Sequence, residues 1–214
     1  MKNVIWATFI FIWAFIYSLY EIEVEAKYGW AGKLPVYKIV EKNDIFPAGL
    51  SSWNVLMIVL LFFSLLNPLF FSYIFNLNIH KRHIYLIIIS FMCWTVIEDF
   101  MWFNYNPYYN KDTKSKKYKF KKFAQFNGKD IKWHKFQKKS KIPDLYYFIT
   151  GLIMIKFIIF TFRKADIDPS GDLNFPLQFL TYIILICIFS YLGKFYCNFY
   201  MNNLNKRTNL KLLK

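Results

Sequence analysis

The sequence is poor in glycine, cysteine and acidic residues, and it lacks the common catalytic motifs. Its 214 residues include seven glycines, 13 acidic residues and three cysteines. Cys93, Cys187 and Cys197 lie far apart without C-x-x-C spacing, which argues against a disulfide framework or a zinc cluster and indicates packing residues. No G-x-S-x-G, P-loop, G-x-G-x-x-G or H-E-x-x-H motif is present, so the sequence carries no signature of the familiar hydrolases or nucleotide-binding proteins.

What the sequence has instead is long apolar runs. It is 56% hydrophobic and 22% aromatic, and its charges gather between the runs, which is typical of a polytopic membrane protein. Each run is near the roughly 20 residues that a helix needs to cross about 30 Å of hydrocarbon. The runs are residues 4–20, 53–75, 84–104, 146–162 and 177–196. The first is the shortest, but no A-x-A-like cleavage site follows it, so we interpret it as an uncleaved helix. The sequence predicts an all-α fold, a single integral membrane domain over residues 1–214 with about five transmembrane helices.

The net charge of +15 is concentrated in one segment between two apolar runs. Thirteen lysines lie between Lys111 and Lys141, inside the predicted loop of residues 105–145. In a membrane protein, such a loop is retained on the cytoplasmic side and faces anionic lipid. We therefore predict a multipass protein of the cell membrane whose partners are the bilayer and, at the lysine-rich loop, anionic lipid. Nucleic acid is not an expected partner, and the C-terminus is expected to be cytoplasmic.

Alternation from that loop predicts which segments share a side. The N-terminus, the turn at Lys81–Arg82 and the acidic loop of residues 166–172 are expected outside, where the basic turn is a mild exception to the charge rule. Three polar clusters are expected together at the cytoplasmic face: Glu21–Glu25, Glu98–Asp99 and Trp133–His134.

Glu98 and Asp99 interrupt the third apolar run. An acid at the centre of a spanning helix typically costs about 2.5–3.5 kcal/mol on insertion scales, so it is a functional-site hypothesis from the start. On a helix, Trp94, Glu98 and Trp102 form one stripe, with Asp99 in the neighbouring sector. Two interpretations stay open: a carboxylate pair for metal binding or proton transfer, or acids that cap the helix or pair with an interfacial lysine.

The remaining candidates are also open to two interpretations. The run Glu21-Ile-Glu-Val-Glu25 places three acids on one face if extended, but only Glu21 and Glu25 if helical, and it is either a cation site or a solvated turn. His134 is the one histidine in the basic loop, where an incidental solvated role is the alternative to a ligand. His80 and His83 have the spacing of a ligand pair or of an interfacial turn.

Three sequence elements carry a resemblance to a known family. They are Glu21-x-Glu-x-Glu-x-x-x-Gly29-Trp30-Ala31-x-x-Leu34-Pro35, Glu98-Asp99-Phe100-x-Trp102-Phe103-x-x-Asn106-Pro107, and Trp133-His134. Together they resemble a family of small polytopic membrane proteins from bacteria and archaea that has no assigned activity. The family continues its LP element with Thr-Trp-Arg where this chain has Val36-Tyr37-Lys38, and it has glycine where this chain has Asn110. The resemblance implies that Glu98, Asp99 and His134 belong to one site, but it assigns them no role.

The sequence therefore favours a membrane-embedded enzyme that works at the cytoplasmic interface on an amphiphilic substrate. The expected catalytic residues are Glu98, Asp99 and His134, and the expected substrate-binding residues are Trp102, Asn106 and Trp133. Carboxylate and imidazole donors suit a divalent cation such as Mg²⁺, Mn²⁺ or Zn²⁺, with Glu21, Glu25, Glu98, Asp99 and His134 as candidate ligands. The alternatives are a small transporter or channel subunit with Glu98 and Asp99 as an ion or proton relay, or a structural membrane subunit.

Overall fold

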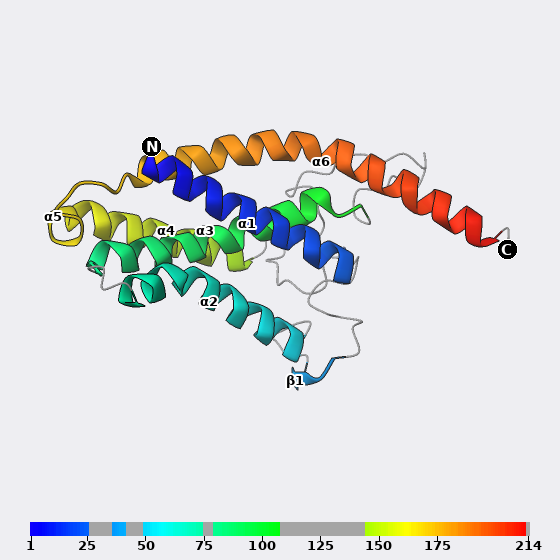
Figure 1. The fold of residues 1–214 in the computed structure, drawn as a ribbon, viewed down its shortest axis with the longest axis horizontal. Helices are drawn as coiled ribbons and strands as arrows, with labels where there is room; N and C mark the ends of the chain where they lie inside the picture. Colours follow the sequence, from blue (N-terminus) through cyan, green and yellow to red (C-terminus); the bar gives the residue numbers. More distant parts are fainter. Residues whose placement is uncertain (26–35, 42–48, 75–78, 108–143, 213–214) are drawn as a thin grey trace.

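The computed structural model describes residues 1–25, 36–41, 49–74, 79–107 and 144–212, and most of these are helical. The elements in chain order are α1 (Lys2–Glu25), β1 (Lys38–Val40), β2 (Leu50–Ser51), α2 (Ser52–Ile74), α3 (Lys81–Tyr105), α4 (Asp144–Phe162), α5 (Lys164–Ile167) and α6 (Phe175–Leu212). The long helices alternate in direction along the chain, so α1, α3 and α6 run one way while α2 and α4 run back (Figure 1). Helices α1, α3 and α6 therefore end at the same end of the molecule at which α2 begins.

The core of the bundle is formed where α1 packs against α3 and α6. Helix α1 contributes a continuous stripe of buried residues at helical spacing to this core: Ala7, Ile10, Phe11, Ala14, Ser18, Ile22 and Glu25. Phe11 of α1 meets Phe189 of α6 with ring centroids 5.0 Å apart. Trp6 Nε1 donates a hydrogen bond of 2.8 Å to Ser90 Oγ of α3, which ties the two helices together inside the apolar layer. The same stripe places Glu25 on the protein-facing side of α1.

The outward faces of the helices are apolar, which supports a membrane location. Exposed residues include Leu56, Leu60 and Phe63 of α2 and Ile183, Ile184 and Ile188 of α6. Among the described residues, three helices are long and apolar enough to cross a membrane: Lys2–Glu25, Lys81–Tyr105 and Phe175–Cys197. The apolar helices Ser52–Asn67 and Ile149–Phe162 are shorter, so the membrane interpretation holds with three candidate spans and a five-span bundle stays a prediction.

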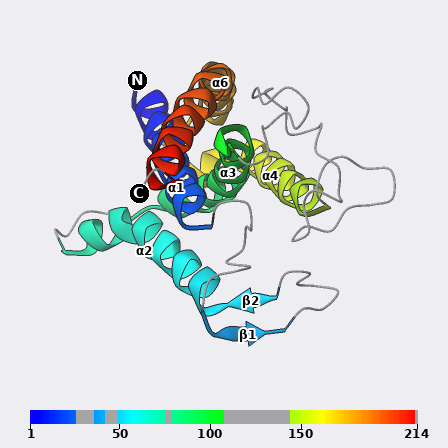
Figure 2. The same ribbon diagram turned by 90° about the vertical axis from the view of Figure 1, so that its right-hand side faces the viewer.

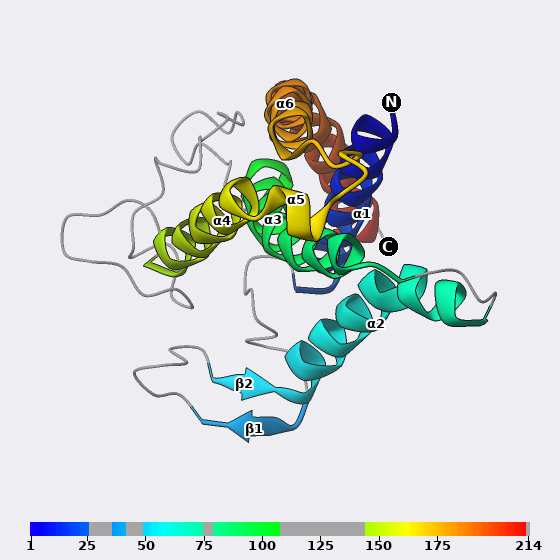
Figure 3. The same cartoon turned by 90° about the vertical axis from the view of Figure 1, so that its left-hand side faces the viewer.

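The structure changes two expectations about the first half of the chain. The first apolar run was expected to be the shortest span, yet α1 continues for 24 residues, because Ile22 and Glu25 keep the helical period of the buried stripe. The all-α prediction also missed a small antiparallel hairpin, in which Lys38 pairs with Ser51 and Val40 with Leu50. Figures 2 and 3 show α2 leaning away from the other helices towards this hairpin.

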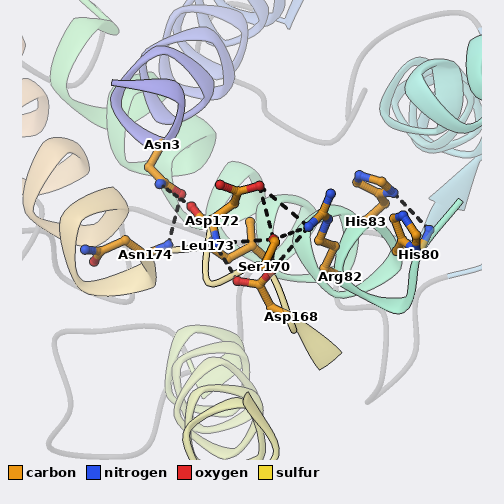
Figure 4. A network of polar contacts seen from close by, with 9 residues as sticks. All are labelled: Asn3, His80, Arg82, His83, Asp168, Ser170, Asp172, Leu173 and Asn174. Atoms are coloured by element: carbon orange, nitrogen blue, oxygen red, sulfur yellow. Dashed lines mark hydrogen bonds and ion pairs between the residues drawn. The ribbon is translucent and has the colours of Figure 1, made fainter. Parts of the chain in front are cut away.

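A polar network joins three segments at the end opposite the hairpin (Figure 4). Arg82, at the start of α3, contacts Asp168 at 3.5 Å and Asp172 at 3.6 Å, and it also donates to Ser170. This pairing explains the basic turn that was an exception to the charge rule, because its arginine is matched by acids of the loop before α6. The N-terminus lies at the same end, since Asn3 Nδ2 donates to the backbone oxygen of Asp172 at 2.8 Å.

Asp168 is the centre of this network. Its carboxylate accepts 2.8 Å hydrogen bonds from the backbone N–H of Leu173 and from Ser170 Oγ. Burial acts to raise the pKa of Asp168, but these hydrogen bonds and the Arg82 guanidinium outweigh burial and hold the pKa below its usual value. His80 and His83, the other candidates in this region, form the start of α3, where the His80 backbone N–H donates to His83 Nδ1 at 3.1 Å.

Candidate functional site

Four carboxylates line one cavity at the end of the bundle where α1 and α3 finish and α2 begins. The cavity has a volume of about 240 Å³ and lies between α1, α2 and α3, with Ile149 of α4 at its side. The acids are Glu21 and Glu25 from α1 and Glu98 and Asp99 from α3. The aromatic lining residues are Tyr17, Phe91, Trp94 and Trp102, and α2 contributes Asn54, Met57, Ile58 and Leu61. The structure thus brings together two pairs of acids, one from each helix, that are more than 70 positions apart in the sequence.

The helical form of residues 21–25 decides which α1 acids reach the cavity. The sequence left an extended and a helical conformation open, and the structure has the helical one, because α1 continues to Glu25. Glu21 and Glu25 are one turn apart and both line the cavity. Glu23 is exposed, because it lies on the opposite side of the helix. Two carboxylates of this run, not three, belong to the site.

On α3 the expected stripe of Trp94, Glu98 and Trp102 lines the cavity along its whole length. Thr95 and Asp99, which lie in the neighbouring sector, line it too, so this part of α3 presents two adjacent sectors to the same space. Glu98 is 6% exposed and Trp94 is 3% exposed, so this side of the cavity is formed by side chains held in the core.

Asn106 has a different place from the one expected of a substrate-binding residue. It is fully buried directly after α3, and its backbone N–H donates to the Trp102 oxygen at 2.8 Å. It is not among the described residues that line the cavity. The expectation grouped Asn106 with Asp99 on one helical stripe, but about two further helical turns carry it beyond the lining residues. Trp102, by contrast, lines the cavity as a substrate-binding residue would.

The carboxyl groups in the cavity contact one another and a tryptophan. The carboxyl groups of Glu21 and Glu98 lie next to each other in the cavity, close enough for one proton to be shared between them. Trp53 Nε1 donates to Glu25 Oε1 at 3.1 Å, which ties the end of α1 to the start of α2. The site therefore holds two neighbouring carboxyl groups, with the Glu25 carboxyl held beside them by Trp53.

Among the polar atoms of the lining, an acceptor and a donor are buried without a hydrogen-bond partner in the described part of the chain. They are Glu98 Oε1 and Trp94 Nε1, one acceptor and one donor. The Trp94 ring is fixed by an edge-to-face contact with Tyr17, with centroids 4.8 Å apart and planes at 72°. Buried polar atoms are normally hydrogen-bonded, so an unused acceptor and an unused donor in a cavity wall point to a ligand or to water inside it.

Four of the five predicted metal ligands, Glu21, Glu25, Glu98 and Asp99, lie within the described residues. His134 and Trp133 lie outside the described residues, as does the lysine-rich segment 111–141. Among the residues that are described, no group of three or more His, Cys, Asp or Glu side chains is placed so that it could hold a metal ion. The carboxylates share a cavity without converging on one point, so divalent-cation binding stays a prediction that depends on His134.

The sequence did not identify the contributions of Tyr17 and of α2. Tyr17 could have been found, because it lies one turn before Glu21 on the stripe that carries the acids. Trp53, Asn54 and Met57 carry no charge and sit at the start of an ordinary apolar run, so nothing in the sequence marked them. Comparisons with family models, with curated proteins and with solved structures found no match.

Proposed function

We propose that this protein is a membrane-embedded enzyme that uses the Glu21–Glu98 pair as acid and base on the polar group of an amphiphilic substrate. The observation that carries the proposal is the pair itself: the carboxyl groups of Glu21 and Glu98 line the same 240 Å³ cavity, and Glu98 Oε1 is buried there without a hydrogen-bond partner among the described residues. A pair that shares one proton can both accept and donate a proton, which is what general acid–base catalysis requires.

The proton transfers balance within the pair. The ionised carboxylate takes a proton from a water or hydroxyl nucleophile as the new bond to the substrate forms. The protonated carboxyl gives its proton to the leaving oxygen as that bond breaks, so the pair ends with one proton, as it began. Glu98 Oε1 is the oxygen that the nucleophile would approach, because its neighbouring acids leave it without a donor among the described residues. Trp102 and Trp94 are positioned to hold the substrate.

The location proposed for this site is the cytoplasmic interface of the cell membrane. Helix α3 ends beside the cavity and α4 starts again at the same end, so the intervening segment with its thirteen lysines begins and returns there. Lysine-rich loops stay in the cytoplasm and attract anionic lipid, which supports this orientation and this lipid partner for residues 111–141. An amphiphile could then keep its chain among the apolar faces while its polar group enters the cavity.

The same pair would also suit a proton relay, which is the second candidate function. A buried carboxyl that exchanges one proton with its neighbour is the kind of group that proton-coupled transporters use. The pair lies near the ends of α1 and α3, at one side of the apolar layer. This position favours the enzyme over the relay, because a relay needs polar groups that continue across the apolar layer. Among the described residues, the other charged network lies at the opposite end, around Arg82.

The experiment is a comparison of lipid composition over time in nanodiscs. The purified protein is reconstituted with a total lipid extract, and each lipid class is followed by mass spectrometry. We expect one class to be converted by the wild type, with Glu98→Gln reducing the rate by about 100-fold or more. Glu23→Gln is the matched control, since Glu23 lies on the same helix but is exposed and faces away from the cavity.

Two results would count against the enzyme. Unchanged lipids in a folded sample, together with Glu98-dependent proton uptake in proteoliposomes, would favour the relay. Equal conversion rates in the wild type and in Glu98→Gln would remove the carboxyl pair from the mechanism.

A further inference from the structure

We infer that the cavity binds an organic ammonium group, a primary amine or a quaternary ammonium, together with a neighbouring oxygen of the same molecule. The inference rests on the proposed function, for which it names the chemical class of the substrate. Such a group is found both in lipid headgroups and in small free molecules, so the chemistry is shared by two sources.

The first reason is the charge around Glu98. Its Oε1 is buried and has no hydrogen-bond partner among the described residues. Among the described residues, the ionisable groups that act on it are the carboxyl groups of Glu21, Asp99 and Glu25, and none of them is a cation. A buried carboxylate oxygen in this setting needs a cation or strong donors, and an N–H or N–CH₃ cation that enters the cavity would meet this need.

The second reason is the kind of wall that faces this oxygen. Tyr17, Phe91, Trp94 and Trp102 line the cavity beside the acids. Aromatic rings attract cations over their faces, and tryptophan does so best, which is why cages of aromatic residues recognise quaternary ammonium groups. Trp94 Nε1 is a buried donor without a partner among the described residues, so it can serve the hydroxyl or ester oxygen next to the ammonium carbon.

The third reason is size and ligand count. The volume of about 240 Å³ is far more than a bare metal ion fills and leaves room for an organic group. A divalent cation needs several oxygen ligands at about 2.0–2.6 Å, and within the described part of the chain no three candidate ligands are so placed. An ammonium group needs one carboxylate and aromatic faces, which this wall supplies.

The test uses the full-length protein in detergent with two ammonium probes and a neutral analogue that differs from one of them only in charge. Calorimetric titration compares choline and ethanolamine with 3,3-dimethylbutanol, the neutral isostere of choline. Native mass spectrometry then measures which lipids stay bound from an equal mixture of phosphatidylethanolamine, phosphatidylcholine and phosphatidylglycerol. We expect at least about ten-fold tighter binding of one ammonium probe than of the isostere, or selective retention of an ammonium lipid over phosphatidylglycerol. Binding of free choline or ethanolamine would identify a small molecule as the source of the ammonium group. Retention of an ammonium lipid would identify a lipid headgroup as the source.

Variants connect the binding to this cavity. Glu98→Gln and Trp94→Leu should each weaken the binding of the ammonium probe by about ten-fold or more, while Glu23→Gln leaves the affinity unchanged. If Glu98→Gln does not fold, the comparison of choline with its neutral isostere on the wild type still decides the question. Equal binding of charged and neutral probes, or no binding of any ammonium probe, would overturn the inference.

The inference and the proposed function can fail separately. Ammonium binding without any Glu98-dependent turnover would leave the binding site in place and remove the enzyme. Turnover of a lipid without an ammonium group would keep the enzyme and overturn the ammonium site.

Discussion

A single methyl group added at Gly193 tests how tightly α6 holds the end of α3. An ideal Cβ at Gly193 would lie 3.1 Å from the backbone oxygen of Asn104 and 3.2 Å from Cε2 of the Tyr105 ring. Both distances are below ordinary carbon contacts, so either the helices must separate or the ring must turn. The oxygen belongs to the α3 backbone, and the ring is held because the Tyr105 hydroxyl donates to the Phe189 oxygen at 2.7 Å.

We expect Gly193→Ala to lower the free energy of unfolding by about 1 kcal/mol. Overpacking of a well-packed core costs about 1–3 kcal/mol. Exchanging glycine for alanine inside a helix returns up to about 1 kcal/mol through helix propensity. The difference between a mid-range overpacking cost and this gain is the expected loss.

Gly151→Ala is the matched control, since Gly151 also lies within a helix, α4, but has no heavy atom within 4 Å of the added Cβ. Here the propensity acts alone, so stability should rise by up to about 1 kcal/mol. Unfolding by dodecyl sulfate in mixed micelles, followed by circular dichroism, should therefore separate the two variants by about 2 kcal/mol. Equal stability of Gly193→Ala and Gly151→Ala would refute the close contact between α6 and the end of α3.

Two further predictions concern the two ends of the bundle. Asp168→Asn should cost about 2 kcal/mol at neutral pH, through the lost charge-assisted hydrogen bonds. Because the pKa of Asp168 is lowered on folding, this contribution is present above about pH 4 and is lost as the pH falls through the folded-state pKa. Thermal unfolding from neutral to acid pH checks this, and a wild-type advantage that persisted in strong acid would contradict it. Elemental analysis of the folded wild type decides between the metal prediction and the ammonium inference: stoichiometric divalent cation that is lost in Glu98→Gln and His134→Ala would establish the ligand set, and its absence would contradict that set and favour the ammonium site.

The helical period made part of the site predictable from the sequence. Trp94, Glu98 and Trp102 recur every four residues, and a helix can present such a stripe in only one direction. A costly acid pair inside an apolar run must face protein, so the existence of a cavity or a partner at Glu98 followed from elementary energetics. Glu21 and Glu25 followed from the charge-based topology, which placed the end of the first helix beside the end of the third.

Other features depend on tertiary contacts that leave no local pattern. The length of α1 could not be read from hydropathy, because hydropathy registers the acids at its end as polar. Glu25 is nevertheless held in the helix by burial and by Trp53 of the next helix. The hairpin of β1 and β2 consists of two very short strands, too few residues for an alternation signal. Asn106 was grouped with Asp99 by helical spacing, which shows the shared sector but not where along the helix axis the cavity ends.

The two ends of the bundle together argue against a purely structural role for Glu98. At one end, Arg82 reaches Asp168 and Asp172, and Asp168 also receives a backbone and a hydroxyl donor, so its buried carboxylate is paired in the way that stability requires. At the other end, Glu98 is also buried, but the ionisable groups around it in the described part of the chain are further carboxyl groups, and one of its oxygens has no partner there. If Glu98 served only to join helices, it would be expected to have cationic and hydrogen-bonding partners as Asp168 does. An unmatched buried carboxyl gives no such stabilisation, and an apolar residue in its place would cost little. The unmatched carboxyl at the wall of a cavity is therefore better explained by a group that enters from outside the chain.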